Sequence, residues 1–345
     1  MTNTQKEITM SYTPEPAVKI NTRTLYRVLH KALGSKRPHA TTGTAAFSAW
    51  LQTRFPANTW HVDAVGNMHV DLRLDKKHRT LFVAHVDTVH KTVGKNNYKH
   101  SITDNIIRAD GDVLGADDGA GVALLMHLMA HGIPAYYLFT QGEERGGIGA
   151  KYVAKHYAET LVEFDRAIAF DRRGKDSIIT YQGGERCCSD EFADILADDL
   201  NLRHNDFLYS PDSSGVYTDT AEFTLLIPEC TNISVGYDHE HSTKESLDIN
   251  HYDALAKAVV QIDWDALPAA RDPLVEDSLY KFNTTSTHGG DWVGGCGKKY
   301  YNTYDLYAKY DNLDLYGMTK HEMLDMAYTD PELLVALIRN ELGLN

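Results

Sequence analysis

The chain has 345 residues, of which 43% are hydrophobic and 24% are charged, so it can bury one large core or two modest ones. Its 48 acidic residues outnumber its 34 basic residues and give a net charge of -14, which would repel nucleic-acid phosphates and anionic lipids. The polar first fifteen residues lack a signal-peptide core, and no stretch approaches the roughly 18 consecutive apolar residues of a membrane span. We therefore expect a cytoplasmic protein without nucleic-acid or membrane partners.

The hydrophobic pattern alternates between helical and strand periods along most of the chain. In the first part of the chain, we expect helices at residues 22–33 and 42–55, a hairpin at 60–74, strands at 80–85 and 105–109, and a helix at 122–131. The second part follows with a strand at 135–140, a helix at 147–157, strands at 166–170 and 177–181, a helix at 190–200, a strand at 232–236 and a helix at 252–262. Strands that alternate with long helices are typical of a largely parallel sheet covered on both faces. The sequence therefore predicts an α/β fold, a three-layer α/β/α sandwich with a mixed, mainly parallel central sheet.

This alternation weakens beyond residue 267. The stretch 268–345 holds a glycine cluster, many tyrosines and two short helical patterns, at residues 320–327 and 331–342. We expect it to be an irregular C-terminal extension that packs on the α/β domain at residues 21–267, which follows a flexible segment at residues 1–20. We interpret the tyrosines as packing residues, with a homo-oligomer interface or a substrate rim as the alternatives.

Acidic residues and histidines gather at the ends of the predicted strands. Five segments carry them: His85 and Asp87 in His-Val-Asp, Asp117 in Gly-Ala-Asp-Asp-Gly, Glu143 and Glu144 in Gln-Gly-Glu-Glu, Asp171 in Phe-Asp-Arg-Arg, and His241 in His-Glu-His-Ser. In sheets of this kind, ligands bind beyond the carboxyl ends of the strands. We therefore expect these side chains to meet at one edge of the sheet.

Their chemistry indicates metal ions. Two imidazoles and several carboxylates suit zinc or a similar divalent ion, and so many carboxylates packed together without a cation would be strongly unfavourable. A carboxylate that bridges two ions would let one ion polarise a carbonyl while both hold a hydroxide. Another carboxylate must stay off the metals to accept the proton of the water. The adjacent Glu143 and Glu144 offer one of each kind, because successive side chains point in different directions.

Together, the five segments resemble the co-catalytic zinc exopeptidases, a superfamily that includes zinc aminopeptidases, peptidase T and related carboxypeptidases and deacylases. The resemblance covers about residues 22–266 and depends on the ordered set of motifs, each of which is weak alone. It implies two divalent metal ions, with zinc as the first choice and manganese or cobalt as alternatives. One ion would bind His85, Asp117 and Asp171, and the other Asp117, Glu144 and His241.

The resemblance also implies a role for each residue. Asp117 would bridge the two ions, Glu143 would be the general base, and Asp87 would orient His85 from behind. A cis peptide bond is implied between Asp117 and Asp118. His239 is a rival ligand, and we prefer His241 because Ser242 and Glu245 follow it as in the superfamily.

The spacing between Asp171 and His241 bears on the form of the fold. In lidded members of the superfamily a whole dimerisation domain is inserted there, whereas this chain has about seventy residues that core strands and helices already occupy. The resemblance therefore implies the lidless, aminopeptidase-like form. The segment at residues 217–219 resembles a stretch that shapes the pocket, and the lysine that often follows the paired aspartates is Gly119 here.

These observations predict a metal-dependent hydrolase of peptide or amide bonds, and first of all an aminopeptidase in which Glu143 activates a metal-bridging water. The substrate would be a peptide or an N-acyl amino acid. An N-acyl amino acid amidohydrolase, a dipeptidase and a carboxypeptidase stay open as alternatives on the same site. A catalytically silent binding module is the remote alternative.

Other polar residues have simpler interpretations. We expect Arg172 and Arg173 in surface ion pairs rather than at a substrate carboxylate. The 4 cysteines are too irregularly spaced for a disulfide framework, and we interpret Cys187 and Cys188 as small buried residues. His288 is expected to pack within a loop.

Overall fold

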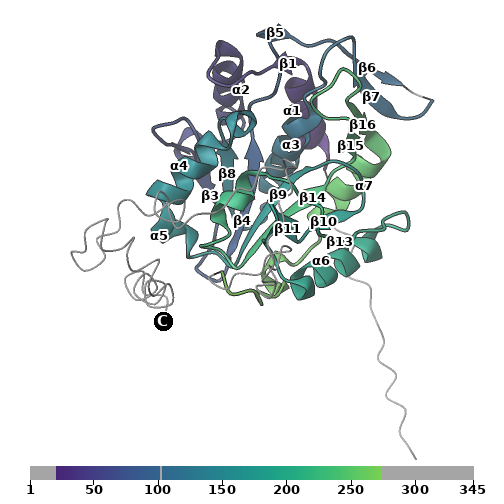
Figure 1. Ribbon diagram of the computed structural model, residues 1–345. Helices are drawn as coiled ribbons and strands as arrows, with labels where there is room; N and C mark the ends of the chain where they lie inside the picture. Colours follow the sequence, from purple (N-terminus) through teal and green to yellow (C-terminus); the bar gives the residue numbers. More distant parts are fainter. Residues whose placement is uncertain (1–20, 102, 274–345) are drawn as a thin grey trace, which may run out of the picture.

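The computed structural model describes residues 21–101 and 103–273. The segment at residues 1–20, nearly all of the C-terminal extension with its two expected helices, and His288 lie outside the described residues. Within the described ranges, helices cover both faces of a central sheet (Figure 1). The three-layer α/β/α sandwich is therefore confirmed, whereas the domain boundary at residue 267 stays a prediction.

Eight strands form the central sheet, in the order β13-β10-β14-β9-β4-β8-β3-β2. Their bounds are β2 His61–Val62, β3 Met68–Asp71, β4 Thr80–His85, β8 Tyr136–Thr140, β9 Arg166–Arg172, β10 Ser177–Ile179, β13 Ser210–Asp212 and β14 Glu229–Ser234. The four central strands β14, β9, β4 and β8 are parallel, and β13 is parallel to β10. The β3–β8, β2–β3 and β10–β14 pairs are antiparallel, so the sheet is mixed and mainly parallel, as predicted.

The central strand β4 shows how the sheet separates two apolar layers. All six of its residues are buried. Phe82 and Ala84 belong to the larger core cluster, whereas Leu81 and Val83 belong to the smaller one, because successive side chains of a strand point to opposite faces. A strand buried on both faces leaves its polar residues to its ends, which is where His85 lies.

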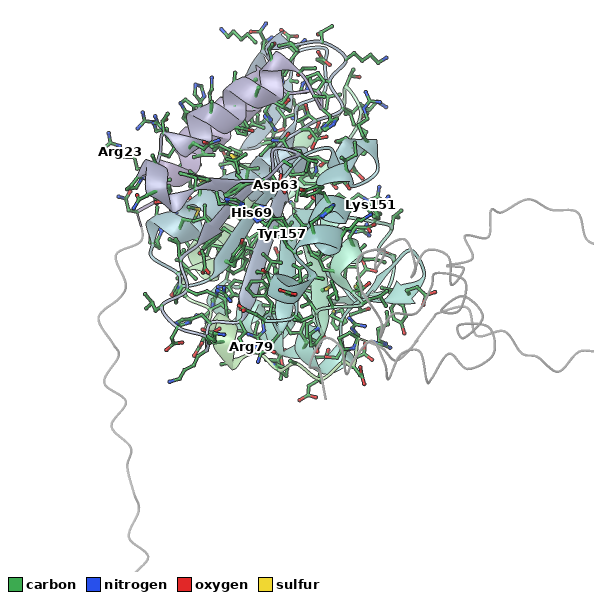
Figure 2. The ribbon with its side chains drawn as sticks, turned by 90° about the vertical axis from the view of Figure 1, so that its left-hand side faces the viewer. Arg23, Asp63, His69, Arg79, Lys151 and Tyr157 are labelled. Carbon is green, nitrogen blue, oxygen red and sulfur yellow. The ribbon has the colours of Figure 1, made fainter. Side chains whose placement is uncertain are left out.

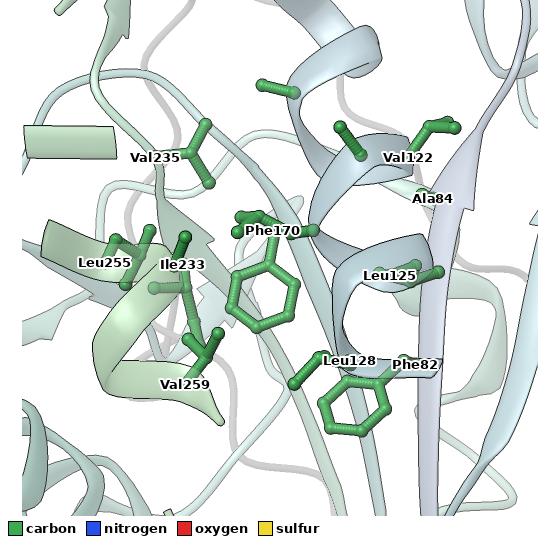
Figure 3. Close-up of a cluster of buried hydrophobic side chains, with 14 of the residues drawn as sticks. Phe82, Ala84, Val122, Leu125, Leu128, Phe170, Ile233, Val235, Leu255 and Val259 are labelled. Carbon is green, nitrogen blue, oxygen red and sulfur yellow. The ribbon is translucent and has the colours of Figure 1, made fainter. Parts of the chain in front are cut away.

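Five helices supply the larger core cluster. They are α1 Arg23–Leu33, α2 Thr42–Gln52, α3 Ala116–Ala130, α6 Asp190–Arg203 and α7 Ile249–Val259. Figure 3 shows Val122, Leu125 and Leu128 of α3 facing Phe82 and Phe170 on the sheet. Of the 15 residues of α3 only Ala130 is not buried, because this helix also packs against α1 and α7.

The opposite face is covered by shorter elements. They are α4 Ile148–His156, α5 Ala158–Leu161 and the 3-10 helix η3 Asp219–Phe223. Phe223, Ile227 and Val153 pack there against Leu81 and Val83. No further domain is inserted between β9 and His241, because those residues form strands and helices of the same sandwich, and the lidless form is confirmed.

A hairpin closes one edge of the sheet, as the sequence predicted. Strands β2 and β3 pair antiparallel, and Asp63 holds the turn between them by accepting hydrogen bonds from Val65 N at 3.0 Å and Asn67 N at 2.9 Å. Figure 2 shows Asp63, His69 and Tyr157 close together at this edge, where the rings of His69 and Tyr157 stack with centroids 4.9 Å apart.

A small outer sheet lies beside the sandwich at the upper right of Figure 1. Its order is β15-β16-β7-β6, with bounds β6 Tyr98–Ser101, β7 Ile106–Ala109, β15 Tyr237–Asp238 and β16 Ser246–Asp248. The pattern predicted the strand at 105–109 but not its antiparallel partner at Ser246–Asp248. This sheet supports both ends of the loop that carries His241.

Short paired strands complete the described elements. They are β1 Ser35–Lys36 with β5 Gly94–Lys95, and β11 Tyr181–Gln182 with β12 Glu185–Arg186; the 3-10 helices η1 Ala57–Thr59, η2 Glu143–Arg145 and η4 Trp264–Ala266 accompany them. The strand expected at residues 177–181 therefore ends at Ile179. Among the described residues, no helix is long and apolar enough to cross a membrane.

Several predicted boundaries are wrong for identifiable reasons. The strand expected at residues 232–236 lies at Glu229–Ser234 and begins at a fully buried glutamate, whose carboxylate accepts hydrogen bonds from the backbone and hydroxyl of Ser189. The helix expected at 252–262 begins at Ile249, because Asp248 caps it by accepting from Asn250 N and His251 N. The helix expected at 122–131 begins earlier, at Ala116, with non-helical dihedral angles at Asp117 and Asp118.

Candidate active site

The carboxyl ends of the central strands carry the predicted residues. His85 is the last residue of β4, and η2 with Glu143 and Glu144 follows β8. Asp171 lies inside β9, one residue before its end, and not after the strand as expected. Asp117 lies in the first turn of α3, and the loop between β15 and β16 brings His241 to the same edge.

Asp117 lies at the centre of this group. Its Oδ1 atom is 3.0 Å from His85 Nε2, and its Oδ2 atom is 2.9 Å from His241 Nε2. His85 Nε2 is also 3.7 Å from Asp171 Oδ1, and His241 Nε2 is 3.1 Å from Glu144 Oε2. The fold thus brings together all five residues that the sequence predicted as ligands, with one carboxylate between two imidazoles.

Backbone contacts fix the position of His85. Its Nδ1 atom lies 3.1 Å from the main-chain oxygen of Asp87 and 3.7 Å from the Asp87 carboxylate. The nearer partner is therefore the carbonyl, which accepts a hydrogen bond from Nδ1–H and leaves Nε2 to face Asp117. The backbone N–H of His85 donates to the Asp118 carboxylate at 3.1 Å.

The carboxylate of Asp87 holds the turn that presents Glu143. Its Oδ1 atom accepts hydrogen bonds from Gly142 N at 2.8 Å and Glu143 N at 3.2 Å. Gly142 has φ of +73°, and a Cβ atom at this position would lie 2.8 Å from the ring of His39. Both conformation and space therefore require glycine directly before Glu143.

Asp171 is held by hydroxyl groups from two other segments. The Thr218 hydroxyl donates to Oδ2 at 2.7 Å, and the Tyr237 hydroxyl donates to Oδ1 at 3.1 Å. The side-chain amide of Asn232 also bonds the backbone N–H and C=O of Asp171, both at 2.8 Å. The segment at 217–219 thus takes part in the site, whereas the sequence gave no signal for Asn232 or Tyr237.

Glu245 organises the turn that carries Asp117. Its two carboxylate oxygens accept four backbone N–H groups at 2.8 to 3.1 Å, those of Leu114, Gly115, Ala116 and Asp117. The sequence indicated Glu245 only as a neighbour of His241 in the motif. The peptide bond between Asp117 and Asp118 is cis, as the resemblance implied.

The carboxylates are close enough to disturb one another. Burial raises the pKa of Glu143 to about 9, with Asp171 and Asp219 adding to the rise against His85. Burial and Asp117 raise the pKa of Asp171 to about 6, and burial raises that of Asp219 to about 7. Hydrogen bonds to Asp117 and Glu144 raise the pKa of His241 to about 11. The site therefore has an excess of negative charge that favours a cation.

The donor set fits divalent metal ions. Three groups each place three ligand atoms within 4.8 Å of one another: His85, Glu143 and Glu144; His85, Asp118 and Asp171; and Asp117, Glu144 and His241. The buried Oε1 atom of Glu144 has no hydrogen-bond partner among the described residues, although a buried carboxylate oxygen normally requires one. A bound cation would provide that partner.

The remaining candidates lie apart from this group. His241, and not His239, belongs to the ligand groups of the described residues, which agrees with the preferred assignment. Arg172 and Arg173 form ion pairs with Asp212 at 3.4 Å and Glu240 at 3.1 Å, as expected, but only Arg173 is exposed and Arg172 is half-buried. Cys187 and Cys188 are fully buried free thiols, which confirms their interpretation as buried residues.

Several solved peptidases have a similar fold. The aminopeptidase PepT of Bacillus cereus has a TM-score of 0.56 at 16% identity, over 70% of this chain and 97% of its own. A tripeptidase of Staphylococcus aureus has a TM-score of 0.58 at 16% identity over the same shares. The TET1 peptidase of Pyrococcus horikoshii has a TM-score of 0.52 at 17% identity, over 68% of this chain and 98% of its own.

No curated protein matches the chain by sequence. The model of peptidase family M28 does match, over residues 67–272, which is more than half of the chain and includes every residue of the candidate site. The resemblance to the co-catalytic zinc exopeptidases is thereby confirmed. The chain belongs to peptidase family M28 and is a metallopeptidase, an enzyme that hydrolyses peptide bonds with the help of metal ions.

Proposed function

We propose that this metallopeptidase is an aminopeptidase that binds two divalent metal ions and removes the N-terminal residue of a peptide. The observation that carries the proposal is the position of Asp117, whose two oxygens face His85 and His241. One ion would bind His85, Asp117 and Asp171, and the other Asp117, Glu144 and His241. Zinc is the first choice for donors of this kind, with manganese or cobalt as alternatives.

When bound, the metal ions would supply Lewis acidity, which polarises the scissile carbonyl and lowers the pKa of water. Glu143 has a separate task. Its Oε2 atom is 3.9 Å from His85 Nε2, farther than Asp117 and Asp171 are, and its backbone is fixed by Asp87. Without cations, burial and the neighbouring carboxylates keep Glu143 protonated at neutral pH, and bound cations would favour its ionised form. Ionised Glu143 can accept a proton from the attacking water and deliver it to the departing amine.

The charge of the site favours a substrate with a free amine. A carboxypeptidase or an N-acyl amino acid amidohydrolase needs a cation for the free carboxylate of its substrate. The two arginines that follow Asp171 are engaged with Asp212 and Glu240. A protonated α-amine, in contrast, is attracted by the surplus of carboxylates. The similar fold of PepT, which is an aminopeptidase, supports this choice.

The test compares substrates that differ in the free group they carry. Purified protein with added zinc, manganese or cobalt should release amine from aminoacyl anilides faster than it hydrolyses N-acyl amino acids. Glu143→Gln should abolish turnover while metal stays bound, with the exposed Glu191→Gln as a matched control that changes neither. Preferential hydrolysis of N-acyl amino acids or of C-terminal residues would contradict the aminopeptidase assignment and support the corresponding alternative.

Assembly and location can be tested separately. The TET1 peptidase of Pyrococcus horikoshii can assemble into a tetrahedron or a large octahedral shell, and its fold is similar to that of this chain. A homo-oligomer is accordingly worth testing by native mass spectrometry. The cytoplasmic location stays a prediction.

A further inference from the structure

Arg37 is fully buried directly behind the candidate metal site. Its guanidinium group donates hydrogen bonds to four main-chain carbonyls: that of Ala32, that of Val86 at 2.9 Å, and those of Ser35 and Gly115, both at 3.4 Å. The group also lies over the ring of Phe47, 4.6 Å from its centroid. A planar fork with several donors is well suited to joining backbone segments in this way.

Two of these carbonyls belong to the segments that carry the predicted ligands. Val86 stands between His85 and Asp87, and Gly115 stands two residues before Asp117. The backbone N–H and C=O of Arg37 also bond Thr88, at 3.3 Å and 2.9 Å, which continues the connection to the same segment. Arg37 therefore ties the strand end of His85 to the helix start of Asp117.

The charge of Arg37 faces the same segments. Burial lowers its pKa to about 10, against the opposing effect of Asp87, Asp118 and Glu245, so the group is protonated at neutral pH. These three carboxylates accept the backbone hydrogen bonds that shape the site. A buried cation next to them offsets part of their mutual repulsion.

Gly119 makes room for this arrangement. A Cβ atom at position 119 would lie 3.2 Å from Arg37 Nη2 and 3.0 Å from Ala32 Cβ, both closer than ordinary contact. Gly119 is buried and has helical backbone angles. Glycine is therefore needed here for lack of space and not for an unusual backbone conformation. Any other residue would push the guanidinium group or α1 away.

We infer that Arg37, admitted by Gly119, is a positioning residue that sets the spacing between His85 and Asp117 in the metal site. The inference depends on the proposed function, because it concerns the same ligands. Arg37 touches neither substrate nor the reacting atoms. Its effect passes through the carbonyls of Val86 and Gly115.

The chain offers a matched control in Arg166. This arginine is also buried, 3% exposed, and also donates to a main-chain carbonyl, that of Leu267 at 2.7 Å. It lies at the start of β9, at the end of the strand opposite Asp171. If a buried arginine acted only by stabilising the fold, substitutions at positions 37 and 166 should have the same effect on zinc binding and kcat.

The experiment compares Arg37→Met, Arg37→Lys, Gly119→Ala and Arg166→Met with the wild-type protein. The zinc dissociation constant is measured by competition with a chromophoric chelator, and kcat and KM are measured on an aminoacyl anilide. Outer partners of metal ligands change metal affinity or activity by about 10- to 100-fold. We expect Arg37→Met to weaken zinc binding and lower kcat within that range, with KM changed by less than about threefold.

The other variants separate position from charge and from stability. Arg37→Lys should recover part of the zinc affinity, because it keeps the charge but loses the fork. Gly119→Ala should weaken zinc binding although no charge is removed. Arg166→Met should lower the melting temperature without changing the zinc dissociation constant or kcat of the folded protein.

The inference would be overturned if Arg37→Met and Gly119→Ala had the same zinc affinity and kcat as the wild-type protein. It would also be overturned if Arg166→Met lost as much zinc affinity and kcat as Arg37→Met. If Arg37→Met does not fold, Arg37→Lys and Gly119→Ala decide the question by the same measurements. Failure of the proposed function is distinguishable, because the wild-type protein would then bind no zinc or hydrolyse no aminoacyl anilide.

Discussion

The two ends of the central sheet treat charge in opposite ways. At the amino end, Arg79 pairs with Asp165 at 3.0 Å, and Arg166 donates to Leu267 O and lies 3.9 Å from Asp265. Figure 2 labels Arg79 at this lower end of the sheet. Opposite charges meet there in ion pairs between residues of the described chain.

At the carboxyl end, carboxylates crowd together around two histidines. Glu143, Asp171 and Asp219 have raised pKa values because burial and their neighbours oppose ionisation. The same strands thus carry neutralised charge at one end and a surplus of negative charge at the other. This difference indicates that the carboxyl end is suited to bind cations, and that its crowded carboxylates reduce the stability of the metal-free protein.

The largest expected effect follows from removing the shared ligand. Asp117→Asn should lose zinc binding and lower kcat/KM by more than about 100-fold, beyond the range found for outer partners of metal ligands. Zinc titration and hydrolysis of an aminoacyl anilide measure both effects. Asp165→Asn at the amino end is the control, because it breaks an ion pair with Arg79 without touching the site. Retained zinc in Asp117→Asn would refute the bridging role.

Glu245→Gln should destabilise the protein. An amide can place only one acceptor where the carboxylate accepts four backbone N–H groups, so we expect a loss of about 3 kcal/mol in the free energy of unfolding. Urea unfolding with a chelator present measures it. A change below about 0.5 kcal/mol, the range of ordinary surface substitutions, would show that the turn before α3 is held by other contacts.

Glu143→Gln should increase the free energy of unfolding of the metal-free protein, whereas Glu245→Gln should decrease it. The folded pKa of about 9 lies above the unfolded value, so stability from this group is present at low pH and is lost as pH rises from about 4.5 through 9. Glutamine removes this loss, and we expect a gain of about 2 kcal/mol at pH 7. Urea unfolding over a pH series checks it. A less stable variant at pH 7 would contradict the surplus of negative charge.

Features of the fold and the site that depend on local sequence could be predicted, whereas those that depend on contacts between distant residues could not. The strand ends and their polar residues follow from local periodicity, so His85, Glu143 and Glu144 were placed on the correct edge from the sequence. Asp171 was also placed there, but β9 continues through it, because Asn232 of the neighbouring β14 bonds its backbone. The ligand roles themselves came from the resemblance and stay predictions.

The supporting residues could not be found in this way. Glu245 bonds Leu114 across 131 residues of chain, and Arg37 reaches Gly115 across 78. Periodicity reports only whether a side chain faces a core, and charged residues are mostly exposed, so no local pattern indicates that Arg37 and Glu245 are buried. Gly119 was noted only as a departure from the superfamily pattern, and nothing in the sequence indicated that it makes room for a buried guanidinium group.

The smallest expected effect concerns a histidine in the helical layer, away from both ends of the sheet. Burial lowers the pKa of His127 to about 4, whereas the histidines of the site have raised values. Its folded pKa lies below the unfolded one, so its contribution to stability is present above about pH 6.5 and is lost as pH falls towards 4.

His127→Gln should therefore reduce the loss of unfolding free energy between pH 7 and pH 5 by about 1 kcal/mol. Urea unfolding at the two pH values, with a chelator present, measures the difference. An identical pH dependence in wild type and His127→Gln would show that this histidine is not held neutral by burial.

The central claim is that Asp117 joins two metal ions in one site at the carboxyl end of the sheet. Calorimetric titration of the metal-free protein with zinc tests it most directly, with elemental analysis of the dialysed product. We predict two zinc ions per chain in the wild-type protein, loss of both in Asp117→Asn, and aminoacyl anilide hydrolysis that appears as the ions bind. A wild-type chain that binds no zinc, manganese or cobalt, or that keeps both ions in Asp117→Asn, would contradict the claim.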